Sequence, residues 1–169
     1  MKFISFIALS AVLTSCWPSS VSFMDKGSMP DEWKKFYLST LENNAPNAPI
    51  SYPPNLSEAV KDGIQNNTRL LIANSMEDSQ VDIEGVINSY SVMPIALQEG
   101  DNASQNRLTI SVRFDIYIKE PEESEMTVTS TRFADYDSNA DLATVEAQLL
   151  EEINTQIVQD VINKLLSNW

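Results

Sequence analysis

The sequence predicts an α+β fold, a two-layer sandwich in which an antiparallel-rich sheet of about four strands carries two helices on one face, in the order β-α-β-β-β-α. Three observations support this prediction. Apolar and polar residues alternate without interruption over 108–118, and an apolar stripe with helical spacing runs through 142–167. A hydrophobic content of 43% in 169 residues is enough for one packed domain with accessory segments.

The first predicted strand and the first predicted helix lie on either side of a proline-rich segment. Residues 33–41 (WKKFYLSTL) alternate as a half-buried strand does. The following stretch, ENNAPNAPISYPP, holds four prolines and is expected to be a loop. Asn55 with Glu58 three positions later has the pattern of a capping box, which predicts a short helix over about 56–66.

The middle of the chain predicts one long strand with an irregularity. Residues 69–73 are expected to form a short extended piece. Residues 81–93 alternate at first and then lose the pattern, so Gly85 indicates a bulge. Pro94 is expected to end this strand.

The last third predicts a hairpin followed by a long helix. The strand over 108–118 turns through the acidic, solvated string EPEESE, and a threonine-rich strand returns over 126–134. Residues 142–167 then form an amphipathic helix that is expected to lie on the sheet. Trp33 and Trp169 are expected to pack against the ends of the domain, with contact to a partner or lipid as the alternative for Trp169, and Met126 is expected in the core.

The N-terminus has the features of a bacterial lipoprotein signal. Lys2 precedes ten residues that are mostly apolar, which as a helix span about 15 Å, half of a bilayer's hydrocarbon core. The string LTSC then resembles a lipobox ending at Cys16, the only cysteine in the chain. We therefore expect a lipoprotein signal peptide at 1–15, a lipidated tether at 16–32 and one domain at 33–169. A secretory peptide with an incidental cysteine is the alternative.

The charge balance excludes several classes of function. One lysine and no acid precede Cys16, so the remainder holds 10 basic and 24 acidic residues, a net charge of −14. Such a chain is a poor nucleic-acid binder, because that affinity depends on Lys and Arg. Histidine is absent, which removes the commonest general base and zinc ligand. We predict no enzyme and no cofactor; an acid–base pair of Asp135 and Asp137 is the enzymatic alternative.

The string DYDSNADLATVE, residues 135–146, spaces its oxygen-bearing side chains like an EF-hand calcium loop. A strand is expected before it where an EF-hand needs a helix, and Ala140 stands where that loop needs glycine. Asp141 is a good N-cap for a helix that starts at Leu142. We therefore interpret the string as a strand-to-helix corner without a metal, with calcium binding as the alternative.

The order of elements, the lipobox and several local strings resemble the LptE family of lipopolysaccharide-assembly lipoproteins. The strings are ENNAP, TRL, EGVINSY, NRLTISV, TRFADYDS, VEAQLLEEI and the closing NW. The resemblance implies a non-enzymatic lipoprotein of the outer membrane, anchored through acylated Cys16 and facing the periplasm. It also implies that the protein plugs the LptD β-barrel translocon, helps that barrel to assemble, and takes part in delivering lipopolysaccharide to the outer leaflet.

The same resemblance implies contacts between basic residues and lipopolysaccharide. The candidate contacts are Arg107, Arg113, Lys119 and Arg132, the positive side chains on or beside the long strands. Any contact must be local, since the net charge opposes general attraction of an anionic glycolipid. An ion pair between Arg132 and a nearby aspartate competes with this role. The alternative for the whole protein is a free periplasm-facing outer-membrane lipoprotein that acts as a binding module or envelope adapter.

Overall fold

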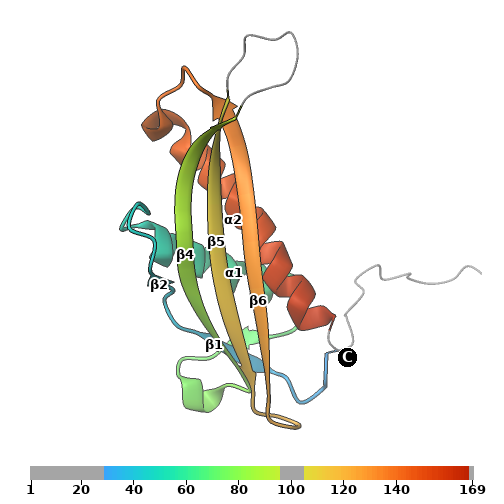
Figure 1. Ribbon diagram of the computed structural model, residues 1–169. Helices are drawn as coiled ribbons and strands as arrows, with labels where there is room; N and C mark the ends of the chain where they lie inside the picture. The colour runs from blue at the N-terminus through green and yellow to red at the C-terminus, as the bar shows by residue number, and fades with distance from the viewer. Residues whose placement is uncertain (1–28, 96–104, 168–169) are drawn as a thin grey trace, which may run out of the picture.

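The structure is a computed structural model that describes residues 29–95 and 105–167. Its three long strands form a tall, curved sheet, and both helices lie on one side of it (Figure 1). The elements are β1 Lys35–Leu38, β2 Glu42–Asn43, α1 Tyr52–Asn67, β3 Leu71–Ile72, the 3₁₀ turn η1 Met76–Asp78, β4 Val81–Ile95, β5 Gln105–Ile118, β6 Ser124–Asp137 and α2 Leu142–Leu166.

The sheet is mixed and has six strands in the described residues, with the order β3-β1-β4-β5-β6 and β2 also paired to β4. Strands β4, β5 and β6 form an antiparallel meander, as the alternation predicted. The prediction of about four antiparallel-rich strands is only roughly matched, because β1, β2 and β3 add parallel pairs. The crossover through α1 explains the parallel pairing of β1 with β4. The two-residue strands β2 and β3 are too short to show any period.

The core lies between the meander and the two helices. All six apolar residues of the β5 alternation are buried, from Leu108 to Ile118. The stripe on α2, from Leu149 to Leu165, is buried against them. Each fully buried aliphatic side chain contributes about 1.5–3 kcal/mol to the free energy of folding, so this layer supplies most of the driving force. Trp33 and Met126 are also buried, as predicted.

Helix α1 begins earlier than the sequence predicted. It starts at Tyr52 and places both following prolines in its first turn, where proline's fixed φ suits the helix and its missing N–H costs nothing. The N-cap is therefore Ser51 and not Asn55, which lies inside the helix. Glu58 does not close a capping box and instead forms an ion pair with Lys61 at 2.8 Å.

Strand β4 differs from the prediction at two points. It continues through Pro94 to Ile95. Proline has no backbone N–H to donate, and it is tolerated here because β5 is the only described strand that pairs with this part of β4. The register shift lies between Ile87 and Ser89 and not at Gly85. Gly85 has another reason to lack a side chain: a Cβ there would lie 2.8 Å from Leu41.

Candidate functional site

One face of the meander is left uncovered by the helices (Figure 1). Side chains alternate between the two faces of a strand, so the residues that stand between the buried ones along β4, β5 and β6 point to this open face. The open face is rich in hydroxyl groups: Ser89, Ser91, Thr109, Ser111, Thr127, Thr129 and Thr131. Thr131 donates a hydrogen bond of 3.0 Å to Ser111 across the β5–β6 pair.

Two arginines of β5 form ion pairs on the open face. Arg107 makes two hydrogen bonds to Asp135, of 2.7 and 2.8 Å, and its guanidinium lies 3.7 Å from the centre of the Phe133 ring. Arg113 bonds Asp115 with Nε at 3.1 Å and Nη2 at 2.6 Å. The hydrogen bonds from these arginines lower the pKa of each aspartate, so both carboxylates stay charged at neutral pH.

Arg132 lies on the opposite, helix-covered face. Its Nε donates to Asp160 of α2 at 2.8 Å, and Ser130 donates to the same carboxylate at 2.5 Å. Burial opposes ionisation of Asp160, but the hydrogen bonds from Arg132 and Ser130 outweigh it and lower its pKa. Arg132 does pair with an aspartate, but the expectation of a nearby one was wrong, because the partner Asp160 belongs to α2 and lies 28 residues away.

Lys119 lies at the other end of β5, where its Nζ is 2.7 Å from Asp82 and also contacts the carbonyl of Met76. At about 3.3 Å per residue, the twelve residue steps from Arg107 to Lys119 span roughly 40 Å. The four predicted basic residues are therefore not brought together: two share the open face, one lies at its far end and one lies on the other face.

The acidic corner before α2 uses its carboxylates within the protein. Asp135 is bound by arginine as described, and Asp141 caps α2 by accepting a hydrogen bond of 3.1 Å from the backbone N–H of Ala143. Glu146 accepts a hydrogen bond of 2.5 Å from the Tyr90 hydroxyl. The predicted N-cap is confirmed. In the parts of the chain that the structure describes, no three His, Cys, Asp or Glu residues are grouped to hold a metal ion.

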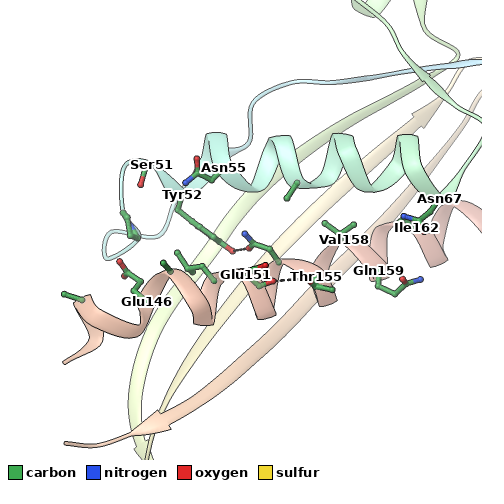
Figure 2. A pocket seen from close by; sticks show the side chains of 16 residues that line it. Ser51, Tyr52, Asn55, Asn67, Glu146, Glu151, Thr155, Val158, Gln159 and Ile162 are labelled. Atoms are coloured by element: carbon green, nitrogen blue, oxygen red, sulfur yellow. Dashed lines mark hydrogen bonds between the residues drawn. The ribbon is translucent and has the colours of Figure 1, made fainter. Parts of the chain in front are cut away.

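Helices α1 and α2 enclose a groove of about 620 Å³ that the sequence did not reveal. Figure 2 shows Tyr52 of α1 reaching towards α2, where its hydroxyl donates a hydrogen bond of 2.9 Å to Asn154. Burial raises the pKa of this tyrosine, so it remains a neutral donor. The groove depends on the alignment of two helices that are distant in sequence, and no local pattern signals that alignment.

The expected lipidation residue Cys16 and the closing Trp169 lie outside the described residues. Within those residues, neither helix has the length and apolar composition needed to cross a bilayer.

The family model for LptE, described as lipopolysaccharide-assembly, matches residues 33–165. A comparison with curated proteins gave no match.

Solved structures share the fold at low identity. An uncharacterized lipoprotein B from Nitrosomonas europaea is 17% identical, with a TM-score of 0.54 over 82% of this chain and 84% of that one. A hypothetical protein from Chlamydia trachomatis is 10% identical, with a TM-score of 0.55 over 80% and 99%. The PelC dodecamer from Paraburkholderia phytofirmans is 11% identical, with a TM-score of 0.53 over 85% and 95%. At these identities the likeness shows the fold alone.

Proposed function

The chain belongs to the LptE family, whose members take part in lipopolysaccharide assembly, and from this premise we propose that it plugs the LptD-type β-barrel of the outer membrane and helps that barrel to assemble. The family match over 33–165 is the observation that carries the proposal, since it spans almost all of the described domain. The proposed role is a binding role, and it assigns the chain no chemical step.

The open face suits a polar lumen. The interior of an outer-membrane barrel is polar, and the hydroxyl-rich side of β4, β5 and β6 presents donors and acceptors that match such a wall. A strand of 14 residues is roughly 46 Å long, whereas the apolar band of such a barrel is about 25 Å tall. One end of the sheet therefore fits inside the barrel while the other extends beyond it, on the periplasmic side.

The proposed anchor is compatible with this placement. Acylation of Cys16 with two or three chains would hold the protein stably at the membrane, where a single chain would not. Residues 29–32, which the sequence assigned to the tether, are instead held against the domain, because Met29 is buried in the core and Asp31 pairs with Arg69. The proposed tether therefore ends at residue 28 and reaches up to about 45 Å when extended. This length allows the domain to enter a barrel from the periplasmic side while its lipid stays in the inner leaflet of the outer membrane.

We propose that lipopolysaccharide is contacted by separate basic side chains and not by one basic cluster. Arg107 and Arg113 each present a guanidinium fork at the open face, and a phosphate can replace the carboxylate that each now binds. Such an exchange is inexpensive, because exposed ion pairs contribute only about 0–1 kcal/mol. Lys119 and Arg132 are separate candidate contacts, each of which must first release its own aspartate.

The test is purification of the tagged, full-length chain from detergent-solubilised envelopes of cells that express it. Mass spectrometry of the eluate should find an outer-membrane barrel in near-equal amount and an intact mass that includes acyl groups on Cys16. An unrelated tagged outer-membrane lipoprotein is the matched control. Recovery of the chain without any barrel refutes the plug and favours the free lipoprotein adapter. Depletion should also reduce the lipopolysaccharide on the cell surface.

A further inference from the structure

Strand β6 forms a long edge of the sheet. It pairs with β5 along its whole length, from Ser124 to Asp137, in one unbroken register. The order of the six described strands ends at β6, so none of them pairs with its other side. Alternate backbone N–H and C=O groups therefore point away from the sheet, in the arrangement that accepts an added strand. The strand contains neither a proline nor a bulge that would block such pairing.

A groove follows the middle of this edge. It has a volume of about 550 Å³ and lies between β6 and the C-terminal half of α2. We call it the β6 groove; its walls are residues 128–132 of the strand and Asp160, Asn163, Lys164 and Ser167 of the helix. Figure 1 shows this half of α2 beside the lower part of β6. A strand edge beside a helix is the geometry in which an extended peptide adds to a sheet and places alternate side chains in a groove.

The walls of the β6 groove are held in position before any ligand arrives. Asp160 accepts hydrogen bonds from Ser130 and from Arg132 and so ties the helix wall to the strand wall. A site that needs little rearrangement loses less free energy on binding. Its wall side chains are hydroxyls, an amide and paired charges, which favour small polar side chains over apolar ones in the occupant.

The charges near the edge indicate the occupant's charge. Glu125 precedes the groove region and Asp137 follows it, whereas Asp135 is paired with Arg107 and the groove walls themselves carry Arg132, Asp160 and Lys164. A second copy that paired antiparallel across the groove would bring Glu125 of each copy against Asp135 and Asp137 of the other. Like charges that face each other across strands destabilise the pair, whereas lysine or arginine at those positions stabilises it. The occupant is therefore a segment with basic side chains at its ends, beside Glu125 and Asp137, and polar side chains in the middle, and it is not another copy.

We propose that the β6 groove binds an extended segment of the barrel partner by strand addition, and that this segment is rich in hydroxyl and basic side chains. The proposal rests on the proposed function. The wall of a closed barrel has no free strand edge, so the segment comes from a loop, or from a part of the partner outside the wall.

The experiment uses the full-length chain co-expressed with its barrel. A photo-crosslinking amino acid replaces the exposed Thr129 of β6, and in a control it replaces the exposed Glu58 of α1. After irradiation, Thr129 should link to a loop of the barrel polypeptide, or to a part of it outside the wall, at a stretch with lysines or arginines, and the Glu58 control should not link to that stretch. Because the Thr129 side chain also faces the open side of the sheet, links to the wall strands alone report the lumen contact of the plug and overturn the strand addition. Mass spectrometry of the linked peptides identifies the stretch.

A charge variant tests the groove separately. Asn163→Arg adds a cation and bulk to the helix wall and should lower the yield of the Thr129 crosslink by roughly tenfold, the factor that about 1.4 kcal/mol produces. Thr155→Arg adds the same residue to an exposed position of α2 outside the β6 groove and should leave the yield unchanged. Circular dichroism should show both variants folded. If Asn163→Arg does not fold, the position of the Thr129 crosslink on the barrel is the test of strand addition.

The outcomes separate this inference from the proposed function. A barrel that co-purifies without a crosslink from Thr129 overturns the inference and leaves the plug intact. A crosslink from Thr129 to a second copy of this chain also overturns it, as does an equal yield from a folded Asn163→Arg variant. If no barrel co-purifies at all, both proposals fail.

Discussion

The substitution Gly63→Ala tests how closely the two helices pack. Gly63 of α1 faces Val158 of α2, and a Cβ at position 63 would lie 2.2 Å from Cγ1 of that valine. Carbon atoms in contact prefer about 3.5–4.0 Å, so the new methyl group falls short by roughly 1.5 Å. Valine in a helix is held strongly in one χ1 rotamer, so the side chain cannot rotate away without cost.

Two opposing effects set the change in the free energy of unfolding. Overpacking a core costs about 1–3 kcal/mol, and the gain in helix propensity from glycine to alanine is about 1 kcal/mol. The distance of 2.2 Å to Val158 is so short that the overpacking cost should lie near the upper end of its range. We therefore expect Gly63→Ala to lower the free energy of unfolding by about 1–2 kcal/mol. Adding Val158→Ala removes the clashing methyl group, and the double variant should be more stable than the sum of the single changes.

Urea unfolding of the purified mature chain, followed by circular dichroism, measures these free energies. Gln65→Ala on the exposed side of the same helix is the control and should change stability by less than about 0.5 kcal/mol. If Gly63→Ala is more stable than the wild type by the propensity term alone, the helices are farther apart than described here and the reasoning is refuted. Additive effects of Gly63→Ala and Val158→Ala would refute it equally.

Three further predictions concern the charges and the anchor. Asp160→Asn removes the charge that Arg132 binds and should lower the free energy of unfolding by about 1.5–3 kcal/mol in urea; a loss below about 0.5 kcal/mol contradicts it. The lowered pKa values of Asp115 and Asp135 mean that the folded state holds fewer protons than the unfolded chain. Stability should therefore fall as the pH drops below about 4, and Asp135→Asn should show a smaller fall than the wild type between about pH 6 and pH 3; equal falls contradict this. Cys16→Ser should leave the chain unprocessed and without acyl groups, and an intact mass that still contains them would exclude this residue as the anchor.

Local periodicity was sufficient to predict an element wherever one of its faces is buried along its whole length. Helix α2 was predicted to within one residue, and strand β5 was predicted correctly at its end and three residues short at its start, because alternation and the helical stripe each reflect one continuous contact with the core. Asp141 was predicted as an N-cap for a similar reason, since capping needs only residues close in sequence. The family resemblance also depended on such local strings.

Contacts between distant segments were not predictable in this way. The start of α1 was missed because prolines indicate a loop unless they fall in a helix's first turn. Gly85 was assigned to a bulge because the sequence cannot show that Leu41 lies against it. Asp160 was not expected to bind Arg132, since 28 residues separate them.

The sequence by itself determined the α+β class, the meander, the long helix and the family, because each is assembled from local patterns, every one of which lies within about 25 consecutive residues. Only the tertiary structure decided which face of the sheet stays open and how the four basic side chains are distributed between the two faces. It also decided that β6 is an edge strand with a groove beside α2. The physical reason is that a surface is defined by which elements cover which others, and that coverage arises from packing between segments far apart in the chain.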